Sequence, residues 1–128
     1  MPRILLLEDD TIFRDLVAAA LRRAGFEVHA APDGQAGWDV LDQANPDLIV
    51  LDMAMPRLDG LSFLRRLRNQ EKWSAVPVLV VSANSSAAAN AVSQGAQGYL
   101  LKSRFSLPEF LETVGGLTAA AARRDAAA

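Results

Sequence analysis

The stretch Leu48-Ile49-Val50-Leu51-Asp52 places a single acid directly after an uninterrupted aliphatic run. Such a run is typical of a strand in a parallel sheet whose two faces are both covered by helices. Ligands of open α/β sheets bind outside the carboxyl ends of the strands. Asp52 is therefore predicted to lie at the edge of the sheet where a binding or reactive site forms.

Other short apolar runs also end in side chains that can take part in chemistry. The run at 4–7 is followed by Glu8, Asp9 and Asp10, the run at 78–81 by Ser82, and the run at 99–101 by Lys102. If these strands lie parallel to the strand that ends at Asp52, their last residues meet at one edge. Carboxylates, a hydroxyl and an ammonium in one place suit phosphoryl and divalent-metal chemistry.

Strand-like and helix-like segments alternate five times along the chain, which predicts an α/β fold. The strands are expected at about residues 3–8, 26–31, 47–52, 76–82 and 98–102. The second strand alternates polar and apolar residues, so it is expected at an edge of the sheet. Because crossovers between parallel strands are right-handed, five such units form a doubly wound five-stranded parallel sheet with five helices. Strand order 2-1-3-4-5 would place Asp52 beside Glu8 and Asp9.

Polar residues that can cap a helix stand before the helix-like segments. These are Asp10 or Thr11, Asp33-Gly34, Asp59-Gly60, Asn84-Ser85-Ser86, and Ser106 with Glu109 in a capping-box pattern and Pro108 in the first turn. Gly25 and Gly95 stand where helices are expected to end.

Composition limits the class of protein. A chain of 128 residues that is 51% hydrophobic, with a net charge of -2, predicts one globular domain without general affinity for nucleic acid. The pairs Arg22-Arg23, Arg65-Arg66 and Arg123-Arg124 are interpreted as solvated helix faces. The absence of cysteine excludes disulfides, thiolate zinc sites and cysteine nucleophiles. No apolar stretch approaches the roughly 20 residues of a membrane span, so a cytoplasmic protein is expected.

The end of the chain has a different composition from the rest. From Gly115 onward the sequence contains two glycines and then many alanines. Because alanine favours helix, residues 107–124 are interpreted either as one long helix or as a helix followed by a linker. Residues 1–114 are therefore expected to form the functional domain, and residues 115–128 the alanine-rich end of the last helix or a linker.

The acids allow competing interpretations. Glu8 and Asp9 would repel Asp52 across neighbouring strands unless a cation joined them, and such oxygen ligands suit magnesium. Asp10 is interpreted as the cap of the first helix. Asp52 alone is a nucleophile, a metal ligand or a helix cap. Because Asp59 supplies a separate cap nearby, Asp52 is free for chemistry.

The remaining polar residues also have two interpretations each. Lys102, one of two lysines beside eleven arginines, either binds a phosphoryl oxygen as a point charge or extends from a strand end to water. Ser82 either donates to a phosphoryl oxygen or caps a helix. It is not expected to be a nucleophile, because the only histidine, His29, lies in the predicted edge strand. Tyr99 either fills the core or has a ring that occupies two positions.

Together these positions resemble the receiver domain of bacterial response regulators over about residues 2–114. The matching residues are Glu8-Asp9 as the acidic pair, Asp52 as the phosphoacceptor, Ser82 as the switch hydroxyl, Tyr99 as the switch aromatic and Lys102 as the family's lysine. The resemblance implies a flavodoxin-like three-layer sandwich. It also implies a signalling switch that catalyses only its own phosphoryl transfer and dephosphorylation, rather than an enzyme acting on other substrates.

The resemblance further implies a mechanism and partners. Asp52 would accept a phosphoryl group from a sensor histidine kinase or phosphotransfer protein, and Lys102 and Ser82 would bind the phosphoryl oxygens. Mg²⁺ would be held by Asp9, Asp52 and the backbone carbonyl of Ala54, with Glu8 acting through water. Ser82 and Tyr99 would relay the change to the face formed by the fourth helix, fifth strand and fifth helix. That face would contact a downstream effector or a second copy of the chain.

One position departs from the family pattern. The family's lysine is usually followed by a proline with a cis peptide, whereas Ser103 follows Lys102. A cis bond without proline costs about 3 kcal/mol, so we expect either a trans bond with a rearranged loop or a cis bond maintained by its neighbours.

Other functions fit the sequence less well. A receiver-like binding module that acts without phosphorylation is the main alternative, and retention of every site residue argues against it. A phosphatase of the haloacid dehalogenase type would need a second aspartate where Ala54 stands. A flavin phosphate would be repelled by the acids that follow residues 4–7.

Overall fold

The computed structural model describes residues 1–127 and has the predicted doubly wound α/β architecture. In chain order the elements are β1 (Arg3–Leu7), α1 (Thr11–Arg23), β2 (Glu27–Ala31), α2 (Gly34–Ala44), β3 (Leu48–Leu51), α3 (Gly60–Arg68), the 3-10 turn η1 (Glu71–Trp73), β4 (Val78–Ser82), α4 (Ser85–Ser93), β5 (Gly98–Leu101), the 3-10 turn η2 (Lys102–Arg104) and α5 (Leu107–Ala127). The strands form one parallel sheet of order β2-β1-β3-β4-β5. This confirms the predicted strand order and the position of the second strand at an edge.

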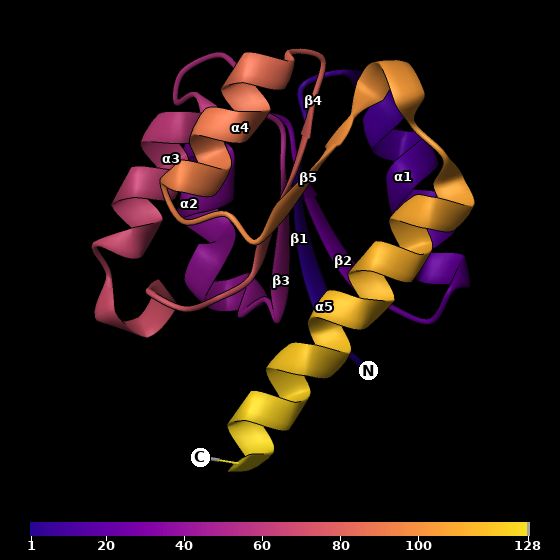
Figure 1. Cartoon of the computed structure of the whole chain (residues 1–128), viewed down its shortest axis with the longest axis vertical. Coiled ribbons are helices and arrows are strands. Elements are labelled where there is room, and N and C mark those ends of the chain that lie inside the picture. The colour runs from indigo at the N-terminus through magenta and orange to yellow at the C-terminus, as the bar shows by residue number, and fades with distance from the viewer. Residues whose placement is uncertain (128) are drawn as a thin grey trace.

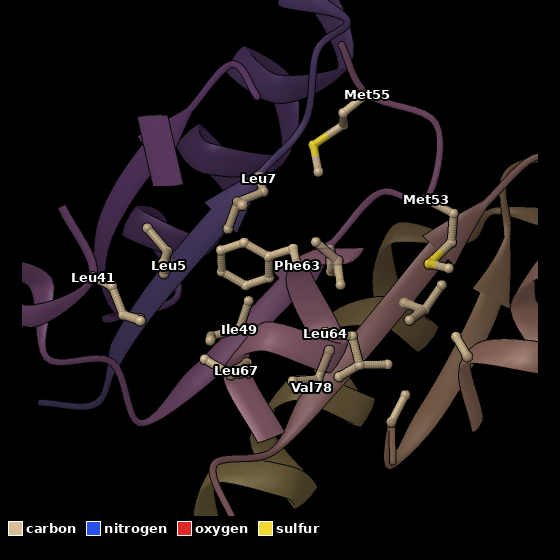
Figure 2. Packing of buried hydrophobic residues seen from close by; sticks show 14 of the residues in the cluster. Leu5, Leu7, Leu41, Ile49, Met53, Met55, Phe63, Leu64, Leu67 and Val78 are labelled. Carbon is tan, nitrogen blue, oxygen red and sulfur yellow. The ribbon is translucent and has the colours of Figure 1, made fainter. Parts of the chain in front are cut away.

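Helices cover both faces of the sheet, as Figure 1 shows, with α1 and α5 on one face and α2, α3 and α4 on the other. Successive side chains of β1 enter different cores: Leu5 and Leu7 pack with α2 and α3, whereas Ile4 and Leu6 pack with α1 and α5. Figure 2 shows the first of these cores around Phe63 of α3. Because a central strand alternates between two buried faces, every position in it must be apolar, which explains the uninterrupted aliphatic runs.

The predicted helix caps are made by side chains in the structure. Asp10 accepts hydrogen bonds from the backbone N–H groups of Ile12 and Phe13, at 3.0 and 3.3 Å. The caps of the later helices are Asp33, Asp59, Asn84 and Ser106. Gly25 and Gly95 have φ of +97° and +111°, in the left-handed region where a side chain would strain the backbone. The sequence therefore predicted where the helices begin and where α1 and α4 end.

In the structure the C-terminal segment forms one long helix, which is the first of the two interpretations of the sequence. α5 continues through Gly115 and Gly116 to Ala127, and in Figure 1 it extends past the edge of the sheet near the N-terminus. Ala128, the last residue of the predicted tail, lies outside the described residues. Within residues 1–127, no helix has the combined length and apolar character needed to cross a bilayer.

The segment after Asp52 is anchored in the core. Met53 and Met55 are buried among the residues between the sheet and α2 to α4, as seen in Figure 2. Gly60, the first residue of α3, donates a backbone hydrogen bond to the Met53 carbonyl at 3.1 Å. A Cβ at Gly60 would collide with the Asp52 carbonyl oxygen and the Met53 Cα. Close approach of α3 therefore fixes the backbone that carries Asp52.

Replacing Gly60 by alanine is expected to lower the free energy of unfolding by about 1–3 kcal/mol, because the backbone at Asp52 and Met53 must shift. Gly116 provides the matched control, since a Cβ there has no neighbour within 4 Å and the residue lies inside α5. Gly116→Ala is expected to raise stability by about 0.5–1 kcal/mol. Urea unfolding of the two variants measures both changes, and similar effects at both positions would contradict the proposed contact.

Candidate functional site

The carboxyl ends of β1 and β3 bring the predicted acids together. Leu7 pairs with Leu51 in the parallel ladder, and the Asp52 backbone N–H donates to the Leu7 carbonyl at 3.0 Å. One carboxylate oxygen from each of Glu8, Asp9 and Asp52 lies within 4.8 Å of the others. The strand order thus joins acids that are far apart in the sequence.

Two of these acids are removed from water. Glu8 is 2% exposed and Asp52 is 5% exposed, whereas Asp9 lies at the surface. Converging carboxylate oxygens with one open side form a donor set that fits Mg²⁺, which prefers oxygen ligands and retains several waters. The residues present therefore suit a hard divalent cation. Ala54, whose backbone carbonyl is the proposed fourth ligand, is exposed between the buried Met53 and Met55.

Lys102, which directly follows β5, reaches two of the acids with its side chain. Its Nζ lies 2.8 Å from Glu8 Oε1 and 3.6 Å from Asp52 Oδ2. The Glu8 side chain is 3% exposed and that of Lys102 is 25% exposed, so the pair is largely screened from solvent. The Lys102 ammonium is therefore primarily the partner of Glu8 and, at a longer distance, a neighbour of Asp52.

The crowding of negative charge changes how Asp52 ionises. Burial, followed by the negative charge of Glu8, raises the pKa of Asp52 from 3.8 to about 7, and the positive charge of Lys102 offsets only part of this. Positive charge placed beside this carboxyl would favour its ionised form and so lower its pKa. The raised pKa is consistent with a site that needs a cation before Asp52 is fully ionised at neutral pH.

The pKa values of two neighbours of Asp52, Asp9 and Lys102, shift so that their charged forms are favoured. Although partial burial opposes the change, hydrogen bonding with Asp52 and Glu8 lowers the pKa of Asp9. Burial also opposes the charged form of Lys102, but its hydrogen bond to Glu8 and the charge of Asp52 raise the pKa of Lys102. The site thus contains a firmly charged lysine, a carboxyl of Asp9 whose pKa is lowered and a carboxyl of Asp52 whose pKa is raised.

Within residues 1–127, neither of the two predicted switch residues, Ser82 and Tyr99, forms a hydrogen bond with the three acids. Ser82, at the end of β4, is 3% exposed; its hydroxyl donates to the Asn84 carbonyl at 3.2 Å and accepts from the Asn84 N–H at 3.1 Å. Asn84, rather than Ser82, caps α4. Tyr99 on β5 is 44% exposed, so it does not fill the core. His29 is not placed to activate Ser82 as a nucleophile, because β1 and β3 separate the strand of His29 from that of Ser82.

The peptide between Lys102 and Ser103 is trans, which is the first of the two outcomes that the sequence allowed. The chain forms the 3-10 turn η2 after β5, with a hydrogen bond of 3.3 Å from the Phe105 N–H to the Lys102 carbonyl. The chain thus leaves β5 through a 3-10 turn, with a trans peptide after Lys102.

Some contributors to the site were not predicted from the sequence. The Arg14 guanidinium donates to the Glu8 carbonyl at 2.8 Å, and the Phe13 ring lies beneath the Lys102 ammonium. Both residues lie in the first turn of α1, directly after the predicted cap Asp10. The sequence did contain one indication of their role, which is that they closely follow the acids. A helix that starts at the site must place the side chains of its first turn nearby.

Comparisons with known proteins agree with the geometry. The family model of the response regulator receiver domain matches residues 4–114. The chain is 39% identical over 119 residues to the DNA-binding dual master transcriptional regulator RpaA of Synechocystis, covering 91% of this chain and 49% of that protein. It is 41% identical over 115 residues to protein-glutamate methylesterase/protein-glutamine glutaminase 1 of Anaeromyxobacter dehalogenans, covering 87% and 32%. The chain thus spans half or less of the length of these curated relatives.

The solved structures that resemble this chain include response regulators. The receiver domain of the Francisella response regulator 1452 has a TM-score of 0.84 at 30% identity, with 93% of this chain and 98% of that chain covered. The Vibrio cholerae chemotaxis protein CheY4 has a TM-score of 0.83 at 28% identity, with 91% and 98% covered. The fold, the converging acids and the matched segment lead to one conclusion: the chain belongs to the receiver domain family of two-component response regulators.

Proposed function

We propose that this domain is a phosphorylation-dependent switch in which Asp52 accepts the phosphoryl group. The observation that carries the proposal is that buried Asp52 lies beside both the ammonium of Lys102 and the carboxylates of Glu8 and Asp9. An ionised Asp52 oxygen attacks the phosphorus of a phosphohistidine on a sensor histidine kinase or phosphotransfer protein. The new O–P bond forms as the N–P bond breaks, the imidazole leaves, and the product is an acyl phosphate.

The neighbouring residues supply positioning and charge. Lys102 and Ser82 bind the phosphoryl oxygens, and Lys102 also holds Glu8 in place. Glu8, Asp9, Asp52 and the Ala54 carbonyl would hold Mg²⁺, which when bound would neutralise charge on the carboxylates and the phosphoryl oxygens. Added positive charge also favours the ionised, nucleophilic form of Asp52, whose pKa is otherwise raised to about 7.

The output follows from a movement of Ser82. We propose that the hydroxyl leaves its bonds to Asn84 for a phosphoryl oxygen and that the exposed Tyr99 ring changes position in response. The surface formed by α4, β5 and α5 then changes its preference for a downstream effector or a second copy. The regulators among the relatives support an effector as the target, with residues 1–114 as the receiver and the end of α5 leading away from it.

Magnesium is expected to stabilise the domain through Asp9. At pH 8, Mg²⁺ at ten times its dissociation constant is expected to raise the free energy of unfolding by about 1.4 kcal/mol. Asp9→Asn should remove most of this gain, because it removes one carboxylate of the cluster. Asp10→Asn is the matched control, since Asn caps α1 as well as Asp does and the gain should persist. Equal gains in both variants, measured by urea unfolding with and without Mg²⁺, would contradict the assignment of Asp9.

The proposal is tested by incubating the domain with Mg²⁺ and acetyl phosphate and measuring the intact mass. We expect one phosphoryl group per chain, none on Asp52→Asn, and normal labelling of Asp59→Asn, whose side chain only caps α3. The proposal would be rejected if the wild-type protein gained no phosphoryl group and its tyrosine fluorescence did not change on adding beryllofluoride. That result would favour the alternative of a receiver-like binding module that acts without phosphorylation.

A further inference from the structure

The position of the Lys102 ammonium is only loosely determined by its backbone. Lys102 begins η2, a turn of three residues with no side-chain cap, closed by the 3.3 Å hydrogen bond from Phe105. The lysine side chain adds a flexible four-carbon stem. The ammonium therefore needs a contact beyond the turn to remain beside Glu8 and Asp52.

That contact is an aromatic ring from another element. Lys102 Nζ lies 5.1 Å from the centroid of the Phe13 ring, within the roughly 6 Å at which a ring face attracts a cation. Phe13 lies in the first turn of α1 and is partly buried, and its N–H is bonded to the capping carboxylate of Asp10. Lys102 is thus placed between a carboxylate from the end of β1 and a ring from α1.

The Phe13 ring is itself supported from the core. It meets the Phe105 ring edge to face, with centroids 5.1 Å apart and planes at 74°. Phe105 in turn packs on Phe110 of α5, with centroids 5.4 Å apart, and Phe110 is fully buried. These three rings form a continuous support from the α5 core to the Lys102 ammonium, and one of them, Phe105, lies in the loop that directly follows η2.

We propose that Phe13 is a positioning residue that holds the Lys102 ammonium toward Asp52 for phosphoryl transfer. This inference rests on the function proposed for Asp52. The ring face attracts the cation and occupies space into which the lysine stem could otherwise rotate. Glu8 alone does not define the direction of the stem, because a single carboxylate oxygen leaves the rest of the side chain free to rotate about it.

The contact is tested by NMR on protein labelled with ¹³C at the lysine ε carbon. Only two signals are expected, from Lys72 and Lys102, and Lys72→Arg assigns them. In Phe13→Leu the Lys102 ε protons should lose their upfield ring-current shift, whereas Phe13→Tyr should retain it. Lys72, whose Nζ lies 4.9 Å from the Trp73 ring centroid, serves as the internal control and should not move. An unchanged Lys102 signal in Phe13→Leu would overturn the proposal.

The positioning role is tested by the rate of phosphorylation by acetyl phosphate. Phe13→Leu is expected to be about fivefold slower and Phe13→Tyr close to wild type. Phe26→Leu is the matched control, because Phe26 packs against the same core but precedes β2 at the opposite edge of the sheet, and its rate should not change. If Phe13→Leu does not fold, Phe13→Met replaces it in both measurements.

The outcomes separate this inference from the function on which it rests. A Lys102 signal that moves without a change in rate would overturn the positioning role, as would equal slowing by Phe26→Leu. A wild-type protein that accepts no phosphoryl group would instead reject the role of Asp52, while the ring-current measurement would still report on the contact itself.

Discussion

Asp52→Asn is expected to stabilise the metal-free domain at pH 8 by about 2–4 kcal/mol, although it removes the proposed reactive group. In the folded state the pKa of Asp52 is about 7, above its ordinary 3.8, so folding favours the protonated carboxyl. Its contribution to stability is complete below pH 3.8 and is lost as the pH rises through 7. Asparagine resembles the protonated form and carries no charge, so it avoids this loss.

The difference in unfolding free energy between Asp52→Asn and wild type should therefore grow from about pH 4 to about pH 7 and then level off. Urea unfolding in EDTA across this range measures it. Asp59→Asn, at an exposed cap on the same connection, should change the stability at pH 8 little, because asparagine caps α3 as well as aspartate does. Added Mg²⁺ should reduce the difference by stabilising only the wild type. Destabilisation by Asp52→Asn at pH 8 would show that the three carboxylates do not repel one another as proposed.

Lys102→Met is expected to have the opposite effect, a loss of about 2–4 kcal/mol, because it leaves the buried carboxylate of Glu8 without its partner at 2.8 Å. Phosphorylation by acetyl phosphate should also slow by about tenfold or more, since a donor to the phosphoryl oxygens is removed. Unfolding free energies and labelling rates of the purified variant measure the two effects.

Two comparisons make the Lys102 result specific. Lys72→Met is the matched control: its Nζ lies 3.9 Å from an Asp42 oxygen, and the two side chains are 59% and 84% exposed, so the change should cost under about 1 kcal/mol. The double variant Glu8→Gln/Lys102→Met should recover much of the stability lost in Lys102→Met, because no buried charge remains unpaired. Additive losses in the double variant would contradict the pairing of Glu8 with Lys102.

The sheet and the convergence of the acids could be predicted because both follow from short-range patterns. An aliphatic run that must be buried on two faces marks a central strand, and Asp52 directly follows such a run. Parallel connection then brings Glu8 and Asp9 to the same edge without any detailed knowledge of side-chain packing. The caps Asp10 and Asp59 were also predictable, since a cap depends on its own helix alone.

What could not be predicted depends on packing between distant segments or on nearly balanced local preferences. The contact of Phe13 with Lys102 joins the start of α1 to η2, and no local pattern encodes it. The bonds between the Ser82 hydroxyl and Asn84 depend on the conformation of one turn. In α5, the unfavourable helix propensity of Gly115 and Gly116 competes with that of the alanines after them, so the sequence left helix and linker open.

The central claim is that Asp52 carries the phosphoryl group, and chemical identification of the modified residue tests it most directly. Borohydride reduces an aspartyl phosphate to homoserine, which peptide mass spectrometry locates after treatment with acetyl phosphate and Mg²⁺. We predict homoserine at position 52 in the wild-type protein and at no position in Asp52→Asn. Homoserine at Asp9 or at any other acid, or an Asp52 that remains unmodified in protein that has gained a phosphoryl group, would contradict the account.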